Sequence, residues 1–142
     1  MTPMVRPVMT IAALALLLGA CSNGPTKSEY AAELRSTMAE VEATNRDSSA
    51  DPEKTRVALA DAAEQLDLVE PPEELADEHR ELVDAVRDMS GAIRLLTDAR
   101  EIAETDPKRA ETLTRRFAED DSFPRVEQAV TAIREAGVDV EL

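Results

Sequence analysis

Aromatic side chains are almost absent from this sequence, which has no tryptophan, one tyrosine and two phenylalanines. Ligand pockets are lined mostly by large apolar and aromatic groups, so we expect no large pocket for an organic ligand. Only four glycines occur, and no glycine-rich phosphate loop, G-x-S-x-G or H-E-x-x-H pattern is present. The single histidine, His79, and the single cysteine, Cys21, exclude a His/Cys zinc cluster and an internal disulfide. We therefore expect no catalytic site, no structural metal and no cofactor.

Positive charge is also scarce, because 16 basic residues face 30 acidic ones and the formal net charge is −14. A strongly acidic chain repels the phosphates of nucleic acid, so we expect no nucleic-acid partner. The same charge argues against binding flat on anionic lipid, which requires a basic face. Solubility is the simpler explanation of the acidity, and a basic partner or loosely held cations are the alternative.

The N-terminal segment has the pattern of an export signal. Arg6 gives a short positive region, and an apolar run extends from about Val8 to Leu18. This run is shorter than the roughly 20 residues that a membrane-spanning helix needs. Its length is typical of the apolar part of a signal peptide.

The apolar run ends in Leu18-Gly19-Ala20-Cys21, which resembles the lipobox of bacterial lipoproteins. The resemblance implies cleavage between Ala20 and Cys21, a diacylglyceryl thioether on the Cys21 sulfur and acylation of the new amino terminus. An ordinary secretory site would have a small residue where Leu18 stands. We interpret residues 1–20 as a signal peptide, 21–27 as a lipidated tether and 28–142 as a helical domain.

The lipid on Cys21 would attach the protein to a membrane, facing the extracytoplasmic space. Ser22 follows the cysteine, and the absence of Asp there resembles lipoproteins that are sent to an outer membrane. The sequence leaves open whether the attachment is to a cell membrane or to an outer membrane.

The remaining sequence predicts an all-α fold, because it is rich in Ala, Leu, Glu and Arg, which favour helix. The first two helices are expected over residues 28–45 and 52–69, and the third from Pro72 to as far as Thr105. A fourth should run from Pro107 to the interruption at Asp120, and a further one through Val126 to a stop at Gly137. Ser28 and Asp51 are the candidate caps of the first two, and Ser90-Gly91 is a candidate bend in the third. Such amphipathic helices bury their apolar stripes only by packing together, which predicts a small three- or four-helix bundle.

Apolar residues recur at steps of three and four along each predicted helix, which marks the faces that should meet in the core. The third helix carries the longest stripe, and His79 falls on it. The tail after Gly137 alternates apolar and acidic residues and supports no assignment. The stripe residues are Tyr30, Leu34, Met38 and Val41; Leu59, Ala62, Ala63 and Leu66; Leu75, His79, Leu82, Val86, Met89, Ile93 and Leu96; Ala110, Leu113 and Phe117; and Val126, Val130 and Ile133.

His79 has two interpretations. A histidine can serve as a general base or a metal ligand, but His79 has no second His or Cys to share a metal. The interpretation we favour is a half-buried residue that forms a hydrogen bond within the bundle.

Acidic residues gather at Glu119, Asp120 and Asp121, which makes them the candidate site for weak divalent-cation binding. The spacing of a calcium-binding loop is missing there. Helical spacing also offers Arg115 and Arg116 as partners for neighbouring carboxylates, which favours a solvated charged face instead.

The stretch Val69-Glu70-Pro71-Pro72, followed by Leu75, His79, Leu82 and Val83, resembles small helical lipoproteins of unknown function, often from actinobacteria. The resemblance implies no catalytic residues. We therefore expect a membrane-anchored lipoprotein whose helical domain binds or supports an envelope protein. The alternative is a binder of a small ligand or a divalent cation in the extracytoplasmic space.

Overall fold

The computed structural model describes residues 24–47 and 51–140, and each regular element in these ranges is helical. The elements are α1 (Lys27–Asp47), α2 (Pro52–Leu68), a short 3₁₀ turn η1 (Glu73–Leu75), α3 (Ala76–Ile102), α4 (Pro107–Ala118) and α5 (Ser122–Glu135). The predicted all-α bundle is confirmed. The lipobox residues Leu18–Cys21 lie outside the described residues.

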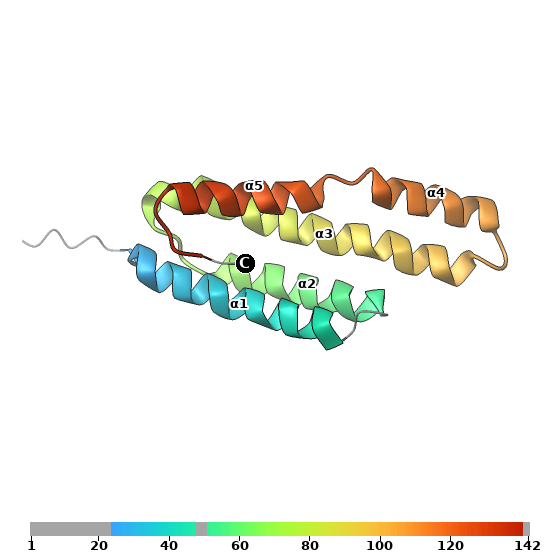
Figure 1. The fold of residues 1–142 in the computed structure, drawn as a ribbon, viewed down its shortest axis with the longest axis horizontal. Coiled ribbons are helices and arrows are strands. Elements are labelled where there is room, and N and C mark those ends of the chain that lie inside the picture. Colours follow the sequence, from blue (N-terminus) through green and yellow to red (C-terminus); the bar gives the residue numbers. More distant parts are fainter. Residues whose placement is uncertain (1–23, 48–50, 141–142) are drawn as a thin grey trace, which may run out of the picture.

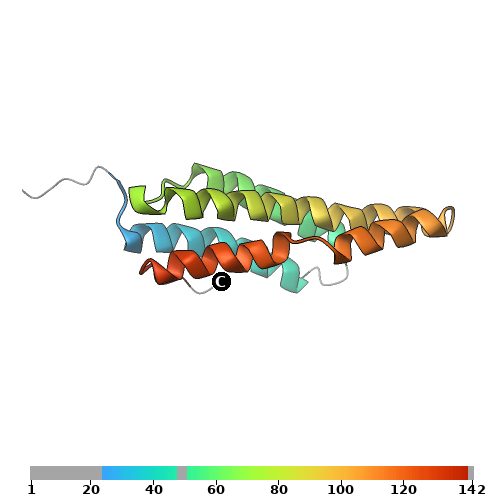
Figure 2. The ribbon, with the colours of Figure 1, turned by 90° about the horizontal axis from the view of Figure 1, so that it is seen from above.

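The bundle has four helical positions, of which α1, α2 and α3 each occupy one, and α4 and α5 together occupy the fourth. α1 and α2 make one antiparallel pair, α3 packs against α2, and α5 and α4 lie end to end along α3 (Figure 1). α3 has 27 residues and is therefore about 40 Å long at 1.5 Å per residue. The end of α3, with α4 beside it, projects past the α1–α2 pair, and the view turned by 90° agrees (Figure 2).

α1 begins with a reciprocal cap between Thr26 and Glu29. The Thr26 hydroxyl accepts a hydrogen bond from the Glu29 backbone N–H at 3.2 Å, and the Glu29 carboxylate accepts one from the Thr26 backbone N–H at 2.8 Å. The Thr26 backbone N–H and its hydroxyl both donate to the Glu29 carboxylate, and these two bonds hold the pKa of Glu29 below its ordinary value. Our prediction of Ser28 as the cap was wrong, because Thr26 and Glu29 have the T-x-x-E spacing of a capping box. Lys27, which we placed in the tether, is therefore helical.

α2 begins as the sequence predicts. The Asp51 side chain accepts a hydrogen bond from the Glu53 backbone N–H at 3.1 Å, and Pro52 is the first helical residue. The helix ends at Leu68, one residue before the predicted end. Pro71 and Pro72 follow and cannot continue it, because proline lacks the N–H that a helix interior requires.

α3 differs from the prediction at both ends. We expected an α-helix from Pro72, but the chain first forms η1, in which the Leu75 N–H donates to the Pro72 carbonyl at 2.8 Å. The helix ends at Ile102 and not at Thr105, and its last turn tightens: the Ala103 N–H donates to the Arg100 carbonyl at 3.4 Å and the Thr105 N–H to the Ile102 carbonyl at 3.1 Å. α3 continues as helix through Ser90-Gly91.

Ser90 has a packing role that the sequence did not reveal. Its side chain is buried, and its hydroxyl donates to the backbone carbonyl of Arg56 on α2 at 3.0 Å. A small residue at this position lets the α2 backbone approach α3 closely. The hydroxyl then forms a hydrogen bond between the two helices at this point.

α4 and α5 have caps that follow from their sequence. The Asp106 carboxylate accepts a hydrogen bond from the Arg109 backbone N–H at 3.1 Å, which starts α4. α5 ends at Glu135 and is closed by Gly137, whose φ is 90° and whose N–H donates to the Arg134 carbonyl at 2.9 Å. The Val138 N–H donates to the Ile133 carbonyl at 3.3 Å, which completes a Schellman closure and confirms the predicted stop.

The C-terminal tail packs back onto the core. Val138 and Val140 are buried, while Asp139 between them is exposed. Arg35 on α1 donates to the Asp139 carbonyl at 3.1 Å, and Arg134 donates to the Val140 carbonyl. The alternation that we could not assign is therefore an irregular segment with its valines facing inward.

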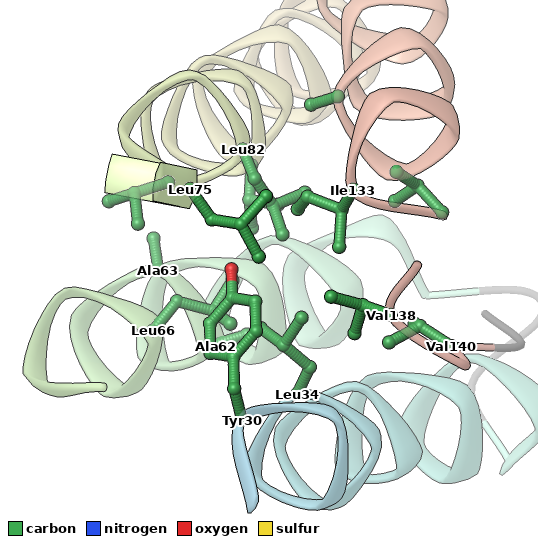
Figure 3. Close-up of a cluster of buried hydrophobic side chains, with 14 of the residues drawn as sticks. Tyr30, Leu34, Ala62, Ala63, Leu66, Leu75, Leu82, Ile133, Val138 and Val140 are labelled. Carbon is green, nitrogen blue, oxygen red and sulfur yellow. The ribbon is translucent and has the colours of Figure 1, made fainter. Parts of the chain in front are cut away.

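Leucine, valine and alanine from α1, α2, α3, α5 and the tail form one core (Figure 3). The four stripe residues predicted for α2 are all buried. On α4 only Ala110 of the predicted stripe is buried, because α3 is the helix on which α4 packs. The largest fully buried side chains are Tyr30, Leu34, Leu66, Leu75, Leu82, Ile133, Val86, Val140 and Ser122.

Candidate functional site

The polar centre of the core is a pair formed by Tyr30 on α1 and His79 on α3. The Tyr30 hydroxyl and the His79 Nδ1 lie 2.9 Å apart, and the two rings meet edge to face with centroids 5.6 Å apart. In Figure 3 the Tyr30 ring rises from α1 with its oxygen directed across the core. Tyr30 is fully buried, and His79 is 7% exposed. The predicted inward position of His79 is confirmed.

The backbone of Leu66 on α2 also lies near the histidine ring, where it favours the protonated form. A neutral imidazole has one donor nitrogen and one acceptor nitrogen. Among the described residues the Tyr30 hydroxyl has no other acceptor, so we assign Nδ1 as the nitrogen that accepts its hydrogen. This pair thus joins α1 to α3 near the end at which the described chain begins.

Burial keeps both groups uncharged. Removal from water lowers the pKa of His79, against the opposing effects of the Leu66 hydrogen bond and the negative charge of Asp67. Burial also raises the pKa of Tyr30 above its ordinary value, and the nearby charge of Glu78 adds to this effect. A neutral imidazole and a neutral phenol can share one hydrogen bond, so Nδ1 of His79 has its partner inside the bundle.

The three acidic candidates lie at the break between α4 and α5. The Asp120 carboxylate accepts hydrogen bonds from the backbone N–H of Ser122, at 2.9 Å, and from its hydroxyl. Glu119 and Asp121 are exposed. Within residues 24–47 and 51–140, no group of three or more His, Cys, Asp or Glu side chains is arranged to hold a metal ion. Asp120 therefore has a structural role at the start of α5.

An arginine that no sequence pattern had singled out joins α5 to α3. The Arg125 guanidinium donates to Glu81 at 2.8 Å and to Asp88 at 2.7 Å, and these two carboxylates are seven residues apart on α3. The hydrogen bonds raise the pKa of Arg125 above its ordinary value. The spacing of seven places both carboxylates on one face of α3. It is the only signal in the sequence that marks this site.

The ion pairs that helical spacing offered to α4 are not formed. No carboxylate oxygen lies within 4.0 Å of Arg115 or Arg116 in the described residues, and the same is true of Lys108 and the Arg109 side chain. The basic side chains of α4 instead extend into solvent. Helical spacing predicted paired charges here, so the exposed and unpaired basic side chains of α4 are a feature that only the structure shows.

A surface cleft of about 490 Å³ lies where the described chain begins, between the segment 24–27 and the connection 70–74. Lys27 lines it, and its ammonium group donates to the Ala136 carbonyl at 2.7 Å and lies 3.6 Å from the Glu74 carboxylate. Pro71 and Pro72 form part of its opposite wall. These contacts tie the beginning of α1 to the end of α5 and to η1.

No protein-family model, curated protein or solved structure matches this chain. Of the helices that the structure describes, none is both long enough and apolar enough to cross a membrane.

Proposed function

We propose that this protein is a lipid-anchored module of a bacterial cell envelope. In this proposal the leader is removed after Ala20, and Cys21 carries the lipid. The helical bundle then faces the extracytoplasmic space and acts there by binding or supporting another envelope component. The observation that carries the proposal is the lipobox, Leu18-Gly19-Ala20-Cys21, with the only cysteine of the chain at the lipidated position.

The position of the bundle relative to Cys21 supports the proposal. The cap of α1 is Thr26, only five residues after Cys21. Five residues span at most about 18 Å, so a lipid on Cys21 would hold the bundle close to the membrane surface. The tip formed by α3 and α4 is at the opposite end of the molecule from the start of α1 (Figure 1). That tip would therefore be the part of the bundle that reaches furthest from the attachment point.

The chemistry of the core supports a non-catalytic role. His79 is the side chain best suited to acid–base work near neutral pH, and it is buried with its Nδ1 bonded to the Tyr30 hydroxyl. The carboxylate of Asp120 is committed to Ser122. Binding through the surface is then the activity that the described side chains favour.

The anchoring proposal is tested with Cys21→Ser in the full chain, produced in a bacterial host that processes lipoproteins. The parent should be found in the membrane fraction and show the added mass of the lipid. The Cys21→Ser variant should lose both properties and keep its leader or leave the membrane. Ser22→Ala is the matched control and should behave as the parent does. Equal retention and equal mass of parent and Cys21→Ser would exclude lipid anchoring.

The binding proposal is tested by in-cell cross-linking of the anchored protein, followed by mass spectrometry of the captured material. A reproducible envelope protein supports a binding module, provided that substitutions on one helix remove it. The structure directs these substitutions to exposed residues, of which the apolar ones with large side chains are Val57, Leu68 and Phe123. If the same protein were still captured after each exposed helix face had been substituted in turn, a specific binding surface would be contradicted.

A further inference from the structure

The unpaired positive charge of the bundle is concentrated on α4. Between Pro107 and Ala118 there are four basic residues and one acidic residue, in a chain whose net charge is −14. The side chains of Lys108, Arg109, Arg115 and Arg116 are exposed and have no ion-pair partner among the described residues. Elsewhere most basic side chains that the structure describes are held by a carboxylate or a backbone carbonyl, as Arg125, Lys27 and Arg35 are.

These four residues and Thr112 form one stripe along α4. Successive members of the stripe are one, three, three and one residues apart, so they share one face of the helix. This face is opposite Ala110, the residue of α4 that is buried. We call Lys108, Arg109, Thr112, Arg115 and Arg116 the basic stripe. From Lys108 to Arg115 it extends about 10 Å along the helix axis, at 1.5 Å per residue. Because α4 projects past α1 and α2, the stripe is not covered by the acidic helices (Figures 1 and 2).

A complementary surface lies on the outer face of α2. Val57, Asp61, Glu64 and Leu68 follow one another at four, three and four residues, opposite the buried face of that helix. We call these four residues the acidic stripe. Asp61 and Glu64 are exposed and have no ion-pair partner in the part of the chain that the structure describes. Val57 is 43% exposed and Leu68 is 85% exposed, and they flank the two carboxylates.

We propose that the basic stripe of α4 docks on the acidic stripe of α2 in a second copy of this chain. The charges are opposite, both surfaces are helical, and each presents its charges at the three- and four-residue steps of one face. Val57 and Leu68 would gain apolar cover from the aliphatic stems of the arginines and the lysine. Each copy has one basic and one acidic stripe, so the contact is head to tail and can extend beyond two copies.

The net negative charge of each copy does not prevent this contact. At physiological ionic strength the Debye length is about 8 Å, so repulsion between the bodies of two copies is largely screened. Charges that meet at contact distance are screened much less. The association should therefore weaken at about 1 M salt, where the Debye length falls to about 3 Å.

The test uses two full-length chains with different tags, produced together in one bacterial host. One carries Thr112→Cys in the basic stripe, and the other carries Gln65→Cys, an exposed position next to Glu64. A flexible bis-maleimide added to the broken cells should link the two chains to each other. Two controls set the background: chains that have only Cys21, and Thr112→Cys paired with Gln128→Cys, which is exposed on α5 outside both stripes. A heterodimer yield no higher than these controls would overturn the proposal.

Charge reversal gives the second arm. Lys108→Glu with Arg115→Glu in the Thr112→Cys chain should lower the heterodimer yield about ten-fold, because attraction becomes repulsion. Asp61→Lys with Glu64→Lys in the Gln65→Cys chain should do the same, and the two reversed chains together should recover the yield. Arg80→Glu with Arg87→Glu, which makes an equal change of charge on α3, is the matched control and should leave it unchanged. The proposal would be overturned if reversing either stripe left the heterodimer yield unchanged. It would also be overturned if the two reversed chains together did not recover the yield.

A linear polyanion is the competing occupant of the basic stripe. Immobilised polyphosphate at physiological salt distinguishes it from a second copy. The parent would be retained on polyphosphate, and the variant with Lys108→Glu and Arg115→Glu would not. If, in addition, no heterodimer formed above background, a polyanion and not a second copy would be the occupant of the basic stripe.

Discussion

The Tyr30 hydroxyl lies 2.9 Å from Nδ1 of His79, although 49 residues separate the two in the chain. Both side chains are buried, so neither can replace its partner by water. A buried donor or acceptor that loses its partner costs about 1–3 kcal/mol. The pair should therefore contribute to the stability of the contact between α1 and α3.

Tyr30→Phe tests this contribution, because it removes the hydroxyl and keeps the ring. We expect the free energy of unfolding, measured by urea denaturation, to fall by about 1–2 kcal/mol, since Nδ1 of His79 is left without a donor. In a double-mutant cycle with His79→Phe, the two effects should be clearly non-additive. Additive losses would show that the hydrogen bond contributes nothing beyond the separate side chains.

The lowered pKa of His79 predicts a loss of stability in mild acid. The unfolded chain binds a proton near pH 6.5, while the folded chain resists it, so the unfolded state holds more protons below that pH. The contribution of His79 is complete above about pH 7. Below about pH 6.5 the free energy of unfolding should fall by up to about 1.4 kcal/mol per pH unit, until the folded-state pKa is reached.

Urea denaturation at pH 7.5, 6.5 and 5.5 measures this effect. His79→Phe lacks the titrating group, so its free energy of unfolding should change less than that of the parent over the same interval. Any fall that parent and variant share in that interval arises from other groups. Identical pH profiles of parent and variant would contradict the lowered pKa of His79.

Arg125→Gln should weaken the contact between α5 and α3. The arginine bridges Glu81 and Asp88, and its side chain is 28% exposed. Partly exposed ion pairs contribute about 0.2–1 kcal/mol each, so we expect a loss of about 1 kcal/mol at low salt. The loss should be smaller at 1 M NaCl, because salt screens exposed charges. Arg80→Gln breaks the more exposed pair with Asp77 and should have almost no effect.

Thr26→Ala should destabilise the beginning of α1, because it removes one half of the reciprocal cap with Glu29. Loss of such a cap typically costs about 0.5–2 kcal/mol. Ser28→Ala is the matched control and should have little effect, since Ser28 is exposed and lies within the helix. Thermal unfolding followed by circular dichroism distinguishes the two variants. A larger loss for Ser28→Ala would contradict the assignment of the cap to Thr26.

The sequence by itself determined the elements and their inward faces. Asp51-Pro52 and Asp106-Pro107 start helices, Gly137 ends one, and the apolar stripes of α1, α2 and α3 point into the core. These features depend on residues within one or two turns of each other, and their physical causes are local. The same kind of local signal, T-x-x-E, marks the true cap of α1, so the choice of Ser28 was an error of interpretation and not a missing signal.

Only the tertiary structure decided which distant groups meet. The pairing of His79 with Tyr30, the bridge from Arg125 to Glu81 and Asp88, and the burial of Val138 and Val140 join segments that are far apart in the chain. Packing selects these partners from many of similar type, so neither spacing nor composition predicts them. The exposure of the basic stripe has the same origin. The stripe lies on α4, which packs on α3 and projects past the α1–α2 pair, so the acidic helices α1 and α2 do not cover it.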